Sequence, residues 1–523
     1  MRDKKASMYL QFVLVKKVRK LLGKLKNKKS TSIDQLDNFA VKLAADYLAG
    51  PLHHVISLSV MQQKFPSGWK LTKIVPLHKK LSTLKPENYR PVAILSPLSK
   101  VLEKAVYEQI YGYFTRNKLF NPALHGYRGG RSTMTALLTM YDRWVKAASK
   151  GQVTGVVLVD LSAAFDLVSP DILIQKLRIY GLKEDILSWI LSYLTDRSQT
   201  VWIDHVYSEL LPNDLGVPQG SNLGPLLFLI FFNDLPEFIN ESIDCYADDS
   251  TLGATDKNIA DIGDKLTHDC KSLSDWMASN KFKLNAGKTH FLVMGTSRRI
   301  DGLTERLEVV MDGIALEESE EQSEILLGIK IVNNLEWKEQ VEELVSKLKT
   351  RLGGLAKLKN IMGFANRKSI VEGVFNSVLC YCLPLFGGCN DCEIKTLQVQ
   401  QNKAAQIALS LPPRSQRNTM YDKLNWLTVS QLIVYHTLLS VHRIRQTEEP
   451  EYLASILGNN ARQAGGRIIL QKSRLELHRK SFTYRGATQW NKLPPDLRKE
   501  PKLSKFKISL KKWVCEHVER FIP

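Results

Sequence analysis

Residues 153–166 read Val-Thr-Gly-Val-Val-Leu-Val-Asp-Leu-Ser-Ala-Ala-Phe-Asp, an apolar run that ends abruptly in an acid. The part 153–159 is rich in β-branched residues and almost entirely apolar, which predicts a buried strand. Asp160 at its end is an unusual choice, because a carboxylate beside a core must be solvated, hydrogen-bonded or bound to a cation. This stretch therefore predicts a sheet with a candidate functional carboxylate at the end of one strand.

A second acidic element follows at Tyr246-Ala247-Asp248-Asp249, between two short segments of strand composition. If these strands neighbour the first one in a single sheet, Asp160 and Asp248 point into a common space. Two carboxylates that close repel each other unless a divalent cation neutralises them, and magnesium prefers such hard oxygen ligands. The alternative is that Asp160 caps a turn and that the acidic pair belongs to a solvated loop.

The stretch between these acidic elements favours a site over plain turns. It reads Gly216-Val217-Pro218-Gln219-Gly220-Ser221-Asn222-Leu223-Gly224-Pro225-Leu226-Leu227-Phe228. Glycines and prolines around one glutamine, followed by an apolar helix that opens at Pro225, let backbone approach a ligand closely and hold an amide at the surface. Turn formation alone would not require so elaborate a sequence.

The composition sets the class of partner. The chain has 523 residues, which suggests three or four modules, and 73 Lys+Arg against 53 Asp+Glu give a net charge of +20. This excess favours nucleic acid, although an anionic membrane surface would respond to the same field. We find no secretory or transmembrane segment, and seven scattered cysteines indicate a reducing compartment, so we expect an intracellular protein of the nucleus or cytoplasm.

The N-terminal part is expected to be auxiliary. Residues 1–29 are strongly basic and are interpreted as a solvated arm, with a nucleic-acid contact or import signal as the alternative. A helix is expected over 34–48, capped by Asp34 and ended by Pro51, with its apolar face turned to the core.

Taken in order, these segments resemble the conserved blocks of reverse transcriptases from non-LTR (LINE-type) retrotransposons, close to the jockey-like and chicken-repeat-like groups. The resemblance covers roughly residues 30–515. Further matching segments are 65–70, 75–80, 88–92, 125–128, 131–133, 280–285, 288–289, 327–329, 335–337, 424–427 and 490–494.

The resemblance implies an RNA-directed DNA polymerase with an α+β right-hand fold. It implies fingers at 55–150, an antiparallel-sheet palm at 151–335 and a helical thumb at 336–410, between a basic arm and helix at 1–54 and a mostly helical region at 411–523. The expected partners are an RNA template, a DNA primer or nicked target DNA, and dNTPs, with no membrane; the sequence does not set the oligomeric state.

The resemblance also assigns the acids. Asp160 and Asp248 would hold magnesium, with two ions expected and Mn²⁺ as a substitute, and Asp249 would be an accessory acid. Such ions clamp the attacking and leaving oxygens of an in-line phosphoryl transfer. Lys288 would donate a proton to the leaving pyrophosphate, its alternative being a simple structural lysine.

The remaining assignments concern the nucleotide. Phe165 would lie under the sugar and exclude a 2′-hydroxyl, Gln219 would touch the nascent pair or template, and Gly220 would let the strand pass closely. Lys79 and Arg90 would contact the triphosphate. The alternatives are a plain core aromatic for Phe165 and a surface lysine for Lys79.

Some features depart from the family or stay open. Ala163 replaces a residue that is usually long and polar, and Leu124 stands where glutamine is common. No room remains for an endonuclease ahead of residue 30, so we expect the chain as written to copy RNA without cutting target DNA. The cysteines at 380, 382, 389 and 392 are interpreted as buried thiols rather than a zinc site. The alternative functions are an intron-maturase-like polymerase and a decayed or domesticated RNA-binding remnant.

Overall fold

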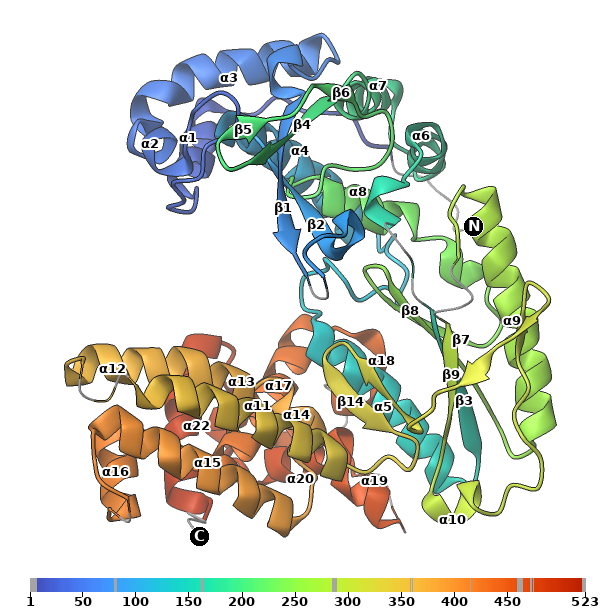
Figure 1. The fold of residues 1–523 in the computed structure, drawn as a ribbon, viewed down its shortest axis with the longest axis vertical. Helices are drawn as coiled ribbons and strands as arrows, with labels where there is room; N and C mark the ends of the chain where they lie inside the picture. The colour runs from blue at the N-terminus through green and yellow to red at the C-terminus, as the bar shows by residue number, and fades with distance from the viewer. Residues whose placement is uncertain are drawn as a thin grey trace.

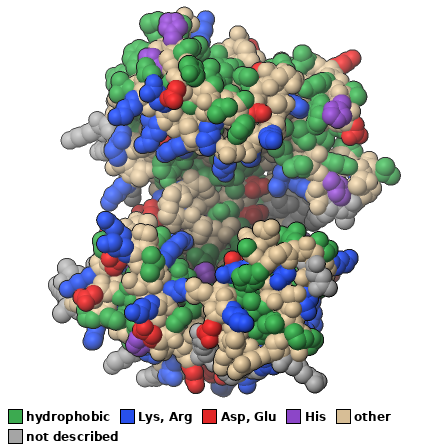
Figure 2. Space-filling model, turned by 90° about the vertical axis from the view of Figure 1, so that its left-hand side faces the viewer, with side chains coloured by type: hydrophobic (Ala, Val, Ile, Leu, Met, Phe, Trp, Pro, Cys, Tyr) green, Lys and Arg blue, Asp and Glu red, His purple; other side chains and the backbone are tan. Residues whose placement is uncertain are grey.

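The computed structural model describes residues 7–79, 82–159, 161, 164–284, 289–357, 359, 361–413, 415–458, 464–470, 473 and 475–519. Two lobes are joined on one side by a central sheet and are separated by a hollow on the other (Figures 1 and 2). The combination of sheets with many helices confirms the expected α+β class.

The upper lobe carries a small sheet surrounded by helices (Figure 1). Its elements are α1 (Val15–Gly23), α2 (Asn38–Leu43), α3 (Ala45–Met61), β1 (Leu71–His78), β2 (Tyr89–Ile94), α4 (Pro97–Arg116), α6 (Pro170–Ile179), α7 (Glu184–Leu194), β4 (Ser198–Ile203), β5 (Val206–Tyr207), β6 (Leu211–Pro212) and α8 (Gly224–Phe231). Strand β1 pairs antiparallel with β2 and parallel with β4. Helix α8 begins one residue before Pro225, where the sequence predicted it.

The central sheet has the strand order β12-β9-β3-β8-β7. The elements of this part are β3 (Val153–Val159), β7 (Ser242–Tyr246), β8 (Asp249–Asp256), α9 (Ile259–Ser279), β9 (His290–Met294), α10 (Ser297–Ile300), β10 (Val310–Met311), β11 (Ile314–Ala315), β12 (Glu317–Glu318), β13 (Ser323–Leu326) and β14 (Ile329–Val332). The predicted strand and the predicted hairpin are therefore both present, and they are neighbours. The pairs β3–β8, β3–β9 and β7–β8 are antiparallel, as expected. At one edge β12 runs parallel to β9, because the chain first passes along α9 through β10 and β11.

The lower lobe is helical and includes one helix from early in the chain. Its elements are α5 (Thr133–Ser149), α11 (Lys338–Ala356), α12 (Phe364–Val371), α13 (Ser377–Leu379), α14 (Leu383–Phe386), α15 (Asp391–Leu409), α16 (Arg417–Leu424), α17 (Val429–Thr447), α18 (Glu451–Leu457), α19 (Glu476–Lys480), α20 (Phe482–Lys492), α21 (Pro495–Lys499) and α22 (Leu503–His517). Helix α5 lies in the range expected for the fingers, yet its buried side chains pack in the core of this lobe (Figure 1).

The two faces of the central sheet serve two different cores. Val153, Val157 and Val159 of β3 join the core that runs through the upper lobe, whereas Val156 joins the core of the lower lobe. All four are almost fully buried. Burial of each such side chain stabilises the fold by roughly 1.5–3 kcal/mol. Because β3 packs in the cores of both lobes, the end of this strand is held in position relative to both.

The N-terminal expectation needs correction. The expected helix is two helices, α2 and α3: Asp37, not Asp34, caps α2, and α3 continues through Pro51 to Met61. Pro51 has no amide hydrogen, so the carbonyl of Tyr47, four residues earlier, lacks its helical hydrogen bond. Tyr47 is 87% exposed, so water can donate to this carbonyl instead. The predicted core face is largely exposed, and a second apolar face with helical spacing is buried in its place. The residues of that buried face are Val41, Ala45, Ala49, Leu52 and Ile56.

The basic segment at the N-terminus is not wholly an arm. Within it, α1 is an amphipathic helix whose Val18, Leu21 and Leu22 are buried. Helix α1 packs against α3 and α4, so part of this segment belongs to the upper lobe.

Candidate active site

The acidic hairpin closes in a tight turn at the edge of the sheet. Tyr246 pairs with Asp249, which leaves Ala247 and Asp248 as a two-residue turn. Ala247 has φ 58°, a left-handed conformation that costs a non-glycine residue about 1 kcal/mol or more. Asp248 is half-buried and Asp249 is exposed, so both carboxylates can reach a ligand from outside the sheet.

The end of β3 lies beside this hairpin. Val159 is paired with Ser250, the residue that follows the acidic pair. A cavity of about 130 Å³ is lined by Val159, Asp249 and Leu327, among others. Asp160, which follows Val159 in the chain, and Lys288 both lie outside the described residues, so their side chains are not placed.

The β13–β14 hairpin borders the same cavity. Its turn is formed by Leu327 and Gly328, which have φ values of 48° and 82°. The hydroxyl of Tyr381, from the helical lobe, donates a hydrogen bond of 2.7 Å to the carbonyl of Leu327. The segment 327–329, which resembles the family's primer-grip region, therefore lies next to Asp249.

The glycine-rich loop 216–224 is docked on β2. The amide of Ala93 donates to the carbonyl of Gln219 at 2.9 Å. Gly220 has φ 121°, and a Cβ there would lie 2.5 Å from the carbonyl oxygen of Ala93, so a side chain is excluded on two grounds. Gly216, with φ 81°, is equally confined, because a Cβ there would lie 2.7 Å from the Cα of Asp166.

A buried acid holds the far end of this loop. Glu103 of α4 is fully buried, and its carboxylate accepts the amide of Asn222 at 2.7 Å and the hydroxyl of Ser99 at 2.7 Å. Burial raises the pKa of Glu103, against the lowering effect of these two hydrogen bonds and of the Arg197 and Lys100 charges. Sequence reasoning missed Glu103, because its partner lies 119 positions away.

Phe165 lies in an aromatic stack next to the loop. Its ring is nearly parallel to that of Phe228, with centroids 4.1 Å apart, and Tyr127 meets it edge-on at 5.9 Å. The residue is half-buried, so one part of the ring stays accessible. The amide of Val217 donates to the carbonyl of Phe165 at 2.9 Å, which fixes the stack relative to the loop.

The side chain of Gln219 is held by an acid to which the sequence assigned no role. Its amide nitrogen donates to both carboxylate oxygens of Asp166, at 2.8 and 2.9 Å. The surrounding protein desolvates Asp166 and raises its pKa, and the bonds from Gln219 oppose this effect. The orientation of Gln219 therefore depends on Asp166.

Tyr127 connects these groups with the acidic turn. The pKa of its hydroxyl is raised by burial first and then by electrostatic interaction with Asp248 and Tyr246, whereas Arg90 lowers it. The preceding residue, Gly126, has no room for a side chain, since a Cβ would lie 2.7 Å from the amide nitrogen of Ala247. Tyr127 belongs to one of the matching segments, but its sequence context alone did not mark it as a site residue.

The two basic candidates lie on the β1–β2 hairpin. Arg90 is opposite Leu77, and the amide of Lys79 donates to the carbonyl of Asn88 at 2.8 Å. Because side chains alternate along a strand, Lys79 and Arg90 are on the same side of the hairpin. Both are exposed. Tyr127 thus contacts the ring of Phe165 and responds to the charges of Asp248 and Arg90. The glycine-rich loop that carries Gln219 and Gly220 is bonded to Phe165 through Val217, and Lys79 lies just beyond the end of its strand.

The donors at the turn fit magnesium. The carboxylates of Asp248 and Asp249 are hard oxygen ligands at an accessible edge, the kind that Mg²⁺ takes together with water and phosphate oxygens. Among the described residues, no group of three or more His, Cys, Asp or Glu side chains is placed to hold a metal. Asp160, the other expected ligand, lies outside those residues.

Of the four cysteines expected to be buried thiols, Cys382 is buried, Cys380 and Cys389 are half-buried and Cys392 is exposed. Burial raises the pKa of Cys380, Cys382 and Cys389 to about 12 in each case, and Cys392 is exposed at the start of α15. These positions provide no metal cluster within the described part of the chain.

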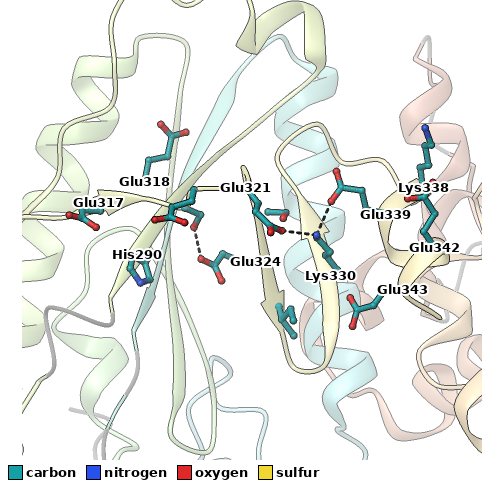
Figure 3. Close-up of a pocket in the computed structure, with 14 residues that line it drawn as sticks. His290, Glu317, Glu318, Glu321, Glu324, Lys330, Lys338, Glu339, Glu342 and Glu343 are labelled. Atoms are coloured by element: carbon teal, nitrogen blue, oxygen red, sulfur yellow. Dashed lines mark hydrogen bonds and ion pairs between the residues drawn. The ribbon is translucent and has the colours of Figure 1, made fainter. Parts of the chain in front are cut away.

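A larger cavity of about 1030 Å³ lies between β12, the β13–β14 hairpin and α11 (Figure 3). It shares His290, Glu324 and Ile325 with the smaller cavity beside Asp249. Glutamates dominate its lining, and Lys330 is paired with Glu321 at 2.9 Å and Glu339 at 3.1 Å. Such a lining repels phosphates, so this cavity is not a path for a polynucleotide.

No helix in the described ranges combines the length and the apolar character that a bilayer crossing requires.

With this geometry in place, the class of protein can be stated. Residues 77–341 match the family described as reverse transcriptase (RNA-dependent DNA polymerase). The match covers about half of the chain and includes the acidic hairpin, the glycine-rich loop, and β2 with the last two residues of β1. The chain belongs to this family.

Its relatives are polymerases of mobile elements. The chain is 25% identical over 464 residues to the "Probable RNA-directed DNA polymerase from transposon BS" of Drosophila melanogaster, across 84% of the chain and 49% of that protein. It is 24% identical over 487 residues to the "RNA-directed DNA polymerase from mobile element jockey" of Drosophila funebris, across 89% and 51%. The jockey protein of Drosophila melanogaster is 23% identical over 420 residues, across 78% and 45%. These matches confirm the expected resemblance to jockey-like elements, and the chain spans about half the length of these relatives.

Proposed function

We propose that this chain is the RNA-directed DNA polymerase of a non-LTR retrotransposon, which extends a primer 3′-hydroxyl with dNTPs copied from an RNA template. The observation that carries the proposal is the position of the Asp248 turn beside the end of β3, with Tyr127 between the charge of Asp248 and the ring of Phe165. Acidic side chains that can hold metal ions, close to an aromatic residue that can support a nucleotide, are what template-directed nucleotidyl transfer needs.

The residues of the site divide the work. Asp160 and Asp248 would hold the metal ions, with Asp249 beside them, and magnesium bound there would neutralise charge on the reacting phosphate and favour ionisation of the primer hydroxyl. Phe165 would support the sugar and exclude a 2′-hydroxyl. Lys288 would supply a proton to the leaving pyrophosphate.

The loop and the β1–β2 hairpin would bind the nucleotide and template. Gln219, oriented by Asp166, would contact the nascent pair, and Gly220 would let backbone approach it. Arg90 can fork onto phosphate oxygens from the side of Tyr127, and Lys79 would add a positive charge further out.

The hollow between the lobes would accept the template–primer duplex. Lys and Arg side chains gather on both sides of this hollow, and acidic side chains lie inside it (Figure 2). Contacts of this kind hold phosphates without reading bases. In this proposal the fingers are 55–150, the palm 151–335 and the thumb 336–410, with 1–54 and 411–523 as flanking regions.

The test is primer extension on an RNA template with a DNA primer, dNTPs and Mg²⁺. We expect extension by the wild type, none by Asp248→Asn, and wild-type extension by Asp256→Asn, an acid at the opposite end of β8 that is paired with Lys265. If the folded wild type binds the duplex but adds no nucleotide, the polymerase proposal is wrong and an RNA-binding remnant is the better description.

A further inference from the structure

The C-terminal region contacts a segment that lies directly behind the acidic turn. Segment 121–131 runs along β7: the amide of Cys245 donates to the carbonyl of Ala123 at 2.9 Å, and the amide of His125 donates to the carbonyl of Cys245 at 2.8 Å. Gly126 then abuts the amide of Ala247 in the turn itself. Displacement of this segment would therefore displace the turn.

Glu449, between α17 and α18, binds two arginines of this segment through both carboxylate oxygens. One oxygen accepts from Arg128 at 2.9 Å, and the other accepts from Nε of Arg131 at 2.7 Å. A terminal nitrogen of Arg131 forms an ion pair with that second oxygen at 2.6 Å. The side chains of Arg128 and Arg131 are 8% and 0% exposed, so water does little to screen the pair.

The two arginines in turn hold the segment's own backbone. Arg128 donates to the carbonyls of Asn121 at 2.8 Å and Leu124 at 3.2 Å, and Arg131 also donates to Leu124 at 3.2 Å. Burial and the charge of Arg131 lower the pKa of Arg128 to about 10, while Glu449 opposes that change. Without Glu449, two buried guanidinium groups would lose the carboxylate that pairs with both of them, and Glu451 would act on Arg128 only as a weaker charge.

A second link joins the C-terminal region to the same face of the sheet. Asp142 of α5 is 1% exposed and accepts hydrogen bonds from the hydroxyls of Tyr452, at 2.8 Å, and Thr483. The next residue, Arg143, is paired with Asp244 of β7. The C-terminal region thus reaches β7 along two routes.

We propose that Glu449 is a positioning residue for the turn that carries Asp248, acting through segment 121–131. The region 411–523 thereby belongs to the working polymerase rather than forming a separate appendage. This inference rests on the proposed polymerase function for its kinetic consequence, while the mechanical coupling can be measured without it.

The test compares Glu449→Gln with Glu448→Gln, the same change at the adjacent exposed acid. Hydrogen exchange followed by mass spectrometry should become roughly tenfold faster in peptides covering 121–131 and 243–250 of Glu449→Gln, with α22 unchanged. Glu449→Asp, which keeps the charge, should retain much of the protection. In primer extension, kcat should fall roughly tenfold with KM for dNTP changed by less than about twofold, as expected when alignment rather than binding is lost.

Unchanged exchange at 243–250 would overturn the inference, and so would faster exchange shared equally by α22, which would indicate general destabilisation. Faster exchange at 243–250 with unchanged kcat would also overturn it. A wild type without polymerase activity would remove the proposed function, and the exchange data would still decide whether Glu449 holds the turn.

Discussion

The buried carboxylate of Glu103 should make stability depend on pH in a direction opposite to that of a salt-bridged acid. Its pKa is raised, so between the ordinary value of about 4.3 and the raised folded value the folded chain binds the proton more tightly than the unfolded chain. The free energy of unfolding therefore falls as pH rises through that window, by up to about 1.4 kcal/mol per pH unit.

Glu103→Gln removes this dependence while keeping the shape of the side chain. Its amide oxygen can accept from the amide of Asn222, and its nitrogen can donate to the hydroxyl of Ser99, so both contacts survive. We expect the unfolding free energy of Glu103→Gln, relative to wild type, to increase steadily as pH is raised from about 4.3 and to level off above the folded pKa.

Urea unfolding followed by tryptophan fluorescence at a series of pH values measures this difference. Glu108→Gln is the control: Glu108 is on the same helix and is paired with Lys17. It shows how much a Glu→Gln substitution on α4 alters the dependence of the unfolding free energy on pH. A difference between Glu103→Gln and wild type that does not vary with pH would refute the reasoning, as would one that shrinks as pH rises.

Three further results are expected. Phe165→Val removes the ring that stacks on Phe228 and should lower the preference for dATP over ATP, measured as the ratio of kcat/KM values, by tenfold or more; an unaltered ratio would contradict the role of the ring. Arg143 and His125 outweigh the effect of burial and lower the pKa of Asp244, so Asp244→Asn should cost about 3–5 kcal/mol of stability at pH 7, a deficit that disappears as pH falls through the folded pKa. In the native protein two of the seven thiols, Cys392 and Cys515, should react fast with a thiol reagent, and a chelator should not change the number of reactive thiols. Metal release on denaturation would refute the thiol interpretation.

The parts of the site that were predictable are those that local sequence encodes. The β-branched run of β3, the short strands on either side of Asp248 and the helix after Pro225 each follow from periodicity and turn chemistry within a few residues. Their assembly into one sheet was an assumption that β3–β8 pairing confirms.

The parts that were not predictable depend on distant partners or on a choice between two equivalent patterns. Glu449 lies 321 and 318 positions from Arg128 and Arg131, and nothing near it in the sequence marks it. The N-terminal helices offered two apolar faces with helical spacing, and the expected single helix is divided at Ala44 into α2 and α3. Packing against α1 and α4, rather than the spacing itself, made that choice.

Single-turnover addition of one dNTP to a DNA primer on an RNA template, compared between wild type and Asp160→Asn, tests the central claim most directly. Loss of a metal ligand should slow addition about a thousandfold or more while duplex binding stays intact, because several kcal/mol of charge stabilisation in the transition state is lost. Addition by Asp160→Asn at a rate close to wild type would contradict the account, since Asp160 and Asp248 would then not share a catalytic metal site.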